Sequence, residues 1–123
     1  MRLCEKIISI GLTAILTIVG ASSALAVPDD STAVTALPYA SDHTRNIAGA
    51  NTYGKVTLQS KGQASAVLWK VCPGRTERVV DLSTSATKQE DSWQVYMNEG
   101  CNYYADVFSN SSSSATIFLR NYN

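Results

Sequence analysis

From about residue 45 onward, polar and apolar residues alternate in short runs, and no helical period of useful length interrupts them. Because successive side chains of a β-strand point to opposite faces, this alternation predicts half-buried strands. Short strands at this spacing favour an all-β fold, either a sandwich or a small barrel, and we predict a small antiparallel β-sandwich. About six strands are expected, at residues 52–60, 64–72, 76–82, 92–97, 101–108 and 115–122.

The N-terminal segment, residues 1–26, has the pattern of a signal peptide. Arg2 and Lys6 precede an apolar run at residues 7–19, and Ala24-Leu25-Ala26 supplies the small residues that signal peptidase reads. The apolar run is shorter than the roughly 20 residues that a membrane-spanning helix needs. We therefore predict cleavage after Ala26, a secreted, extracellular mature chain and no stable membrane insertion after cleavage.

The mature chain is expected to begin with a flexible leader. Residues 27–44 are polar and small, are broken by Pro28 and Pro38, and have no sustained period. The sandwich domain is then expected to occupy residues 45–123.

The cysteines further constrain the fold. Cys4 would leave with the signal peptide, so that Cys72 and Cys101 remain as a pair, for which a disulfide is the simplest role outside the cell. In an antiparallel meander, the end of the second strand and the start of the fifth lie at the same end of the sheet, which permits this bridge. Closing a loop of about 30 residues contributes roughly 3–4 kcal/mol in the chain-entropy model.

Charge and composition argue against several functions. The mature chain has eight Lys/Arg and nine Asp/Glu, so its net charge near zero gives no reason to expect nucleic acid or an anionic membrane as partner. His43, the only histidine, lies in the predicted leader, where an ordered catalytic base is not expected. No spaced metal ligands or phosphate loop are present in the sequence. We predict a protein that is not an enzyme and holds no cofactor or metal.

Aromatic side chains remain as the candidate functional groups of the chain. Trp69 and Trp93 are expected to fill the core. In the strand that contains Tyr103 and Tyr104, the apolar neighbours favour Tyr103 inside and Tyr104 outside, with Phe108 an exposed or edge aromatic. Exposed tyrosine offers a rigid ring with a polar tip, which suits sugars or a protein partner. The candidate binding residues are Tyr96, Tyr104 and Tyr122.

The C-terminal third has a turn glycine, Gly100, before Tyr103-Tyr104 and a serine-rich hairpin at residues 109–114. In this arrangement it loosely resembles the closing strands of bacterial secreted β-sandwich appendages such as prepeptidase C-terminal domains. The spacing after Gly100 is one residue longer than expected for those domains, and a cysteine, Cys101, is inserted. The resemblance implies a non-catalytic accessory or binding role and assigns no role to any residue.

These features together predict a secreted, non-catalytic binding module that recognises carbohydrate or an extracellular protein through exposed aromatics. One alternative is a small effector, such as an inhibitor, toxin or antimicrobial protein, that acts through residues 83–91 or 73–78. Another is a surface subunit that self-assembles through the edge of the last strand. Asn110 begins a glycosylation sequon, which matters only in a eukaryotic secretory pathway.

Overall fold

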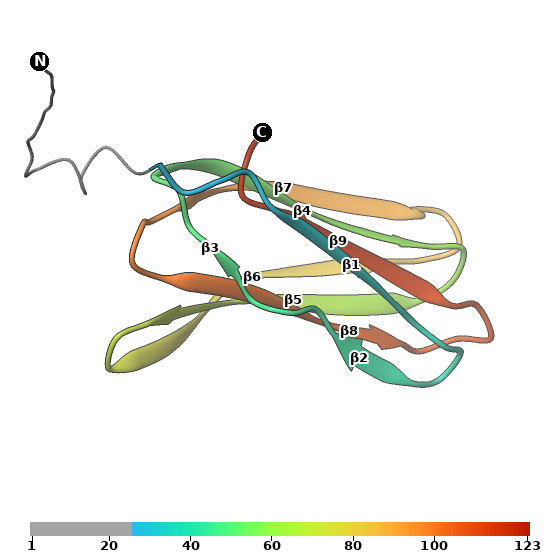
Figure 1. The fold of residues 1–123 in the computed structure, drawn as a ribbon. Helices are drawn as coiled ribbons and strands as arrows, with labels where there is room; N and C mark the ends of the chain where they lie inside the picture. The colour runs from blue at the N-terminus through green and yellow to red at the C-terminus, as the bar shows by residue number, and fades with distance from the viewer. Residues whose placement is uncertain (1–25) are drawn as a thin grey trace, which may run out of the picture.

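Two β-sheets packed face to face make up the described part of the chain (Figure 1). The structure is a computed structural model that describes residues 26–123, so the predicted signal peptide lies outside the described residues apart from Ala26. No helix long and apolar enough to cross a membrane occurs among the described residues. The strands are β1 (Ser31–Ala36), β2 (Ser41–His43), β3 (Ile47–Ala48), β4 (Thr52–Ser60), β5 (Ala64–Cys72), β6 (Arg75–Thr84), β7 (Glu90–Met97), β8 (Asn102–Ser109) and β9 (Ala115–Arg120).

The sheets are built mainly from strands that are distant in sequence. Sheet A has the order β1-β9-β4-β7, and sheet B has the order β2-β8-β5-β6, with β3 also paired to β8. Every pairing is antiparallel, which confirms the predicted fold class. The expected meander is wrong, since only β5 and β6 are neighbours both in the chain and in a sheet. The other connections pass from one sheet to the other, except the one between β2 and β3, which both pair with β8. Each sheet covers the apolar face of the other.

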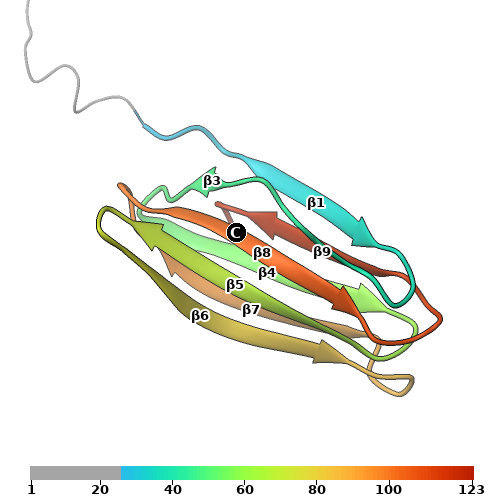
Figure 2. The same cartoon turned by 90° about the horizontal axis from the view of Figure 1, so that it is seen from below.

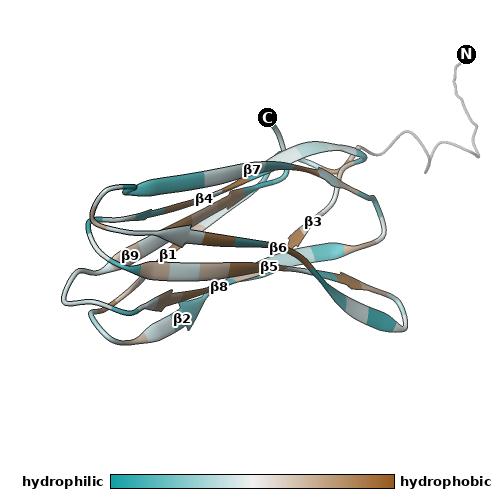
Figure 3. Cartoon of the chain, turned by 180° about the vertical axis from the view of Figure 1, so that it is seen from behind, coloured by the Kyte–Doolittle hydropathy of each residue, from teal (hydrophilic) through white to brown (hydrophobic). Residues whose placement is uncertain are grey.

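The core follows the alternation seen in the sequence, which appears as hydrophobic and hydrophilic segments along the strands (Figure 3). Inward side chains of both sheets are almost fully buried, among them Val56, Leu58, Leu68, Val107, Ile117 and Leu119. Tyr103 is buried and Tyr104 is partly exposed, as predicted. The Tyr103 hydroxyl accepts a hydrogen bond from the Asn98 amide at 2.8 Å, and burial raises the pKa of Tyr103.

The prediction of a flexible leader over residues 27–44 is wrong. Residues 31–36 form β1, which pairs with β9 over six residues and makes one edge of sheet A (Figure 2). Residues 41–43 form β2 beside β8, so His43 lies on a strand. These short segments of small residues carry a weak strand signal alone, but they satisfy the otherwise open backbone edges of β9 and β8.

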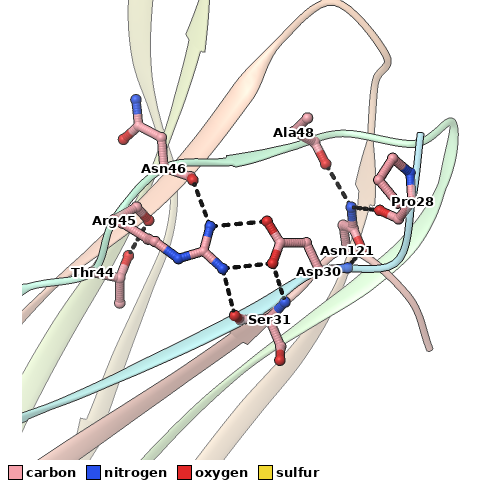
Figure 4. A network of polar contacts seen from close by, with 8 residues as sticks. All are labelled: Pro28, Asp30, Ser31, Thr44, Arg45, Asn46, Ala48 and Asn121. Atoms are coloured by element: carbon pink, nitrogen blue, oxygen red, sulfur yellow. Dashed lines mark hydrogen bonds and ion pairs between the residues drawn. The ribbon is translucent and has the colours of Figure 1, made fainter.

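A set of polar contacts, which we call the polar clamp, fixes the start of β1 (Figure 4). The Asn121 side chain is fully buried and donates to the carbonyls of Pro28 and Ala48, at 3.1 and 2.9 Å. It also accepts from the Asp30 amide at 2.7 Å. The Asp30 carboxylate forms a two-pronged ion pair with Arg45. Asn121 therefore joins the N-terminal segment, the region of β3 and the end of β9.

The predicted disulfide between Cys72 and Cys101 is present. Cys72 ends β5 and Cys101 precedes β8, one step beyond the last register pair of these two strands, Val71 and Asn102. The bridge therefore connects neighbouring strands within sheet B.

Both tryptophan predictions are wrong. Trp69 is partly exposed on the outer face of sheet B, where its register partner is Tyr104. Trp93 is the register partner of the buried Val56 and lies on the same face of sheet A, but it is 54% exposed. It lies on β7, an edge strand of sheet A, where the inner face is incompletely covered. Alternation alone could not place either residue, since each outcome depends on which strands are neighbours.

Candidate functional site

The outer face of sheet A gathers aromatic side chains from three strands and the C-terminal tail. Tyr53 on β4 and Tyr96 on β7 are register partners, and their rings meet edge to face at a centroid distance of 5.4 Å. Phe118 on β9 is 42% exposed, and Tyr122 follows the same strand. This face is defined by the side chains opposite to the buried Val56, Leu58, Ile117 and Leu119, so it is a direct product of period-two alternation.

A pocket of about 370 Å³ opens on this face. We call it the sheet A pocket. Its lining includes Ser31 of β1, Lys55 and Thr57 of β4, Phe118 and Arg120 of β9, and Tyr122. The volume lies in the range of roughly 300–1,000 Å³ that small-molecule sites occupy. The pocket therefore combines two aromatic rings with two cations and the hydroxyl groups of Ser31, Thr57 and Tyr122.

Contacts with Tyr122 hold Arg120 at the pocket. Its guanidinium carbon lies 5.4 Å from the centroid of the Tyr122 ring, and its Nε donates to the Tyr122 carbonyl at 3.0 Å. The polar clamp reinforces this arrangement, because the buried Asn121 separates Arg120 and Tyr122 in the sequence. Arg45 of the clamp also donates to the carbonyl of Ser31 at 3.0 Å, which fixes the β1 side of the pocket.

The outer face of sheet B has aromatic residues too, but their polar groups are used within the face. The Trp69 Nε1–H donates to the Asp106 carboxylate at 3.0 Å. The Arg78 guanidinium lies 5.6 Å from the centroid of the Trp69 ring and contacts the Asp81 carboxylate at 3.5 Å. This row of side chains is a connected surface network, in which Arg78 is paired with Asp81 and the Asp106 carboxylate is bonded to the Trp69 indole.

A second open pocket of about 370 Å³ lies beside this network, lined by His43, Asn46, Tyr104 and Asp106. His43 and Asp106 are register partners on β2 and β8. No group of three or more His, Cys, Asp or Glu residues that could hold a metal ion occurs in residues 26–123.

The three candidate tyrosines do not form one site. Tyr96 and Tyr122 are on the outer face of sheet A, whereas Tyr104 is on the outer face of sheet B. The Tyr96 hydroxyl donates to the Asn51 carbonyl at 3.0 Å, which ties that residue to its own sheet. Phe118, Arg120 and Lys55 also lie on the outer face of sheet A but were not predicted as binding residues from the sequence. Period-two alternation puts Phe118 and Tyr122 on one face of the last strand, but nothing in the sequence shows that β4 lies beside β9.

Comparisons with known proteins identify no family for the chain. No protein-family model matches it, so the resemblance of the C-terminal third to prepeptidase C-terminal domains gains no support. No curated protein matches either. Among solved structures, the chain is similar to the crystal structure of the Yersinia pseudotuberculosis-derived mitogen, with a TM-score of 0.46 and 11% sequence identity. The match covers 78% of this chain and 86% of the mitogen chain. No residue role is transferred from it.

Proposed function

We propose that the chain is a secreted, non-catalytic binding module that recognises a saccharide through the sheet A pocket. The observation that carries the proposal is the lining of this pocket, where Phe118 and Tyr122 lie beside the polar groups of Ser31, Thr57 and Lys55. A pyranose ring has apolar C–H faces and a rim of hydroxyl groups. Aromatic rings suit the faces, and hydroxyl or amine groups suit the rim.

The polar groups of this pocket are available to a ligand. Within residues 26–123, the side chains of Ser31, Thr57 and Lys55 and the hydroxyl of Tyr122 make no hydrogen bond to protein. A group with no partner in the free protein is bonded to water, and a ligand hydroxyl replaces that water at little cost. A ligand that bound to the network on sheet B would instead have to break hydrogen bonds and ion pairs that already exist there.

Export is supported by two independent features. The N-terminal residues have the signal-peptide pattern, and the Cys72–Cys101 bridge is of a kind that persists in oxidising compartments. A chain exported in this way would meet saccharides at a cell surface or in the extracellular medium.

The test is a binding screen of the oxidised protein, residues 27–123, against a glycan array, followed by titration calorimetry on each hit. Phe118→Ala should abolish binding, because it removes one of the two rings of the pocket. Phe108→Ala is the matched control, since Phe108 is exposed to a similar extent on the other sheet. The proposal fails if no glycan binds, or if Phe108→Ala and not Phe118→Ala removes binding, provided that both variants keep the thermal transition of the parent.

A second candidate function is protease inhibition, which the β5–β6 hairpin favours. Its tip, Pro73-Gly74, follows Cys72 directly, so the disulfide anchors the hairpin close to its turn. Figure 1 shows the hairpin extending past the ends of its neighbouring strands. Arg75 beside the tip is exposed and would suit a trypsin-like protease. Inhibition of trypsin that disappears in Arg75→Ala would support this function, and unimpaired trypsin activity at micromolar protein would reject it.

A further inference from the structure

Two cations lie directly opposite each other in the sheet A pocket. Lys55 of β4 and Arg120 of β9 are register partners, and both side chains are on the outer face. Like charges at directly opposed positions of an antiparallel pair repel and destabilise the sheet. The pair of Lys55 and Arg120 therefore lowers the stability of the sheet locally, although the chain as a whole has no net charge.

Neither cation has an acidic partner among the described residues. The ion pairs of this part of the chain are Arg45–Asp30, Arg75–Glu77, Arg78–Asp81 and Lys88–Asp91. Glu90, an acidic residue on the outer face of the neighbouring strand β7, accepts a hydrogen bond from its register partner Gln59. Arg120 uses Nε for the Tyr122 carbonyl, and its two terminal nitrogens have no hydrogen-bond partner in residues 26–123.

We propose that the sheet A pocket selects an acidic saccharide, with the sugar carboxylate held between Lys55 and Arg120 and the ring against Phe118 and Tyr122. This inference rests on the proposed function and names its ligand class. The planar guanidinium of arginine matches a carboxylate with two parallel donors, and the lysine ammonium adds a point charge. A bound carboxylate would also relieve the repulsion between the two cations.

The arrangement of Arg120 supports this assignment. Its contacts with the Tyr122 ring and carbonyl hold the guanidinium in one place before any ligand binds. Such preorganisation lowers the entropy lost on binding, because fewer rotamers remain to be frozen. A neutral sugar would gain much less from this arrangement than a sugar that carries a carboxylate.

The experiment compares acidic saccharides with neutral partners of the same skeleton. Oligogalacturonide and sialyllactose are each measured against their own carboxyl methyl esters by titration calorimetry, at low and at physiological salt. At least one acidic form should bind about ten- to a hundredfold more tightly than its neutral partner, as expected for charge-assisted hydrogen bonds. Raising the salt concentration should narrow this ratio.

Three variants locate the effect. Lys55→Gln and Arg120→Gln should each reduce the preference for the acid by about tenfold or more. Arg78→Gln is the control, because it removes the same charge from the outer face of sheet B and should leave the preference unchanged. Equal losses in Lys55→Gln and Arg78→Gln would reveal a general charge effect and overturn the inference.

The remaining outcomes separate the two proposals. If each acid and its neutral partner bind equally and Phe118→Ala still abolishes binding, the acidic-ligand inference is wrong and the saccharide function stands. If no saccharide of the array or of these pairs binds, both proposals are wrong.

Discussion

Phe118 and Phe108 are exposed to similar extents, 42% and 37%, on opposite faces of the same sandwich, but their surroundings differ. Phe118 lies with Lys55 and Arg120, whose charges have no acidic partner in the described residues. Phe108 shares its face with Trp69 and its bonded neighbours. Exposure of a ring therefore does not by itself distinguish a binding face from a structural one. Under the proposed function, what distinguishes the two faces is that the polar groups around Phe118 are free to bond to a ligand.

The two sheets also differ in the interactions that tie their strands together. Sheet B has a covalent bond between β5 and the start of β8, whereas sheet A depends on the buried amide of Asn121. A disulfide acts largely on the unfolded chain, while an amide that satisfies three backbone groups acts on the native state.

Removing the disulfide should have the largest effect on stability. The double variant Cys72→Ser, Cys101→Ser should lower the free energy of unfolding by about 3–4 kcal/mol, because the unfolded chain regains the entropy of an open loop. Urea denaturation followed by circular dichroism measures this change. A loss below about 1 kcal/mol would mean that the sandwich core alone sets the stability.

Asn121→Ala should be the next most damaging change. It leaves the carbonyls of Pro28 and Ala48 and the amide of Asp30 without their partner, at a cost of about 2–3 kcal/mol. Since Asn121 lies between Arg120 and Tyr122, saccharide affinity should fall as well. Asn110→Ala, at an exposed loop position, is the control and should change neither property. Full affinity in Asn121→Ala would show that the clamp does not position the pocket.

Trp69→Phe should cost about 1–1.5 kcal/mol, because the hydrogen bond from the indole to Asp106 is lost while most of the ring remains. Saccharide binding should be unchanged, since this residue belongs to sheet B. Chemical denaturation and calorimetry of the same preparation measure both quantities. Loss of saccharide binding in Trp69→Phe without a change in stability would place the binding site on sheet B and contradict the proposed site on sheet A.

Acid should have the smallest effect through the Asp30–Arg45 pair. The hydrogen bond from Arg45 holds the pKa of Asp30 below the usual 3.8. The contribution of Asp30 is therefore complete above about pH 3.8 and is lost as the pH falls through its folded pKa. The pair is exposed, so thermal unfolding should show only a small additional decrease in Tm below this pH, absent in Asp30→Asn. An equal decrease in that variant would assign the acid sensitivity to other carboxylates.

Much of the fold was predictable from local pattern. Strands β4 and β5 have the predicted bounds, and the inward position of Tyr103 followed from its neighbours Ala105 and Val107. The disulfide followed from the cysteine count. These features depend on residues close in sequence, or on a pair with no other possible partner.

The candidate site was less predictable, because it depends on strand order. Lys55 and Arg120 are 65 positions apart, and their repulsion is visible only once β4 and β9 are known to be neighbours. The net charge near zero does not reveal this pair either, because a sum over the chain does not show which residues are neighbours. Strand β1 was missed because its small residues form a strand only where β9 offers a free edge.

An NMR titration of the isotope-labelled protein, residues 27–123, with the tightest-binding saccharide of the array would locate the binding face directly. If the saccharide binds in the sheet A pocket, amide shift changes should be concentrated around Lys55, Phe118, Arg120 and Tyr122, with the amides around Trp69 and Tyr104 unchanged. Shift changes confined to β5 and β8 would contradict this prediction and place the binding face on sheet B.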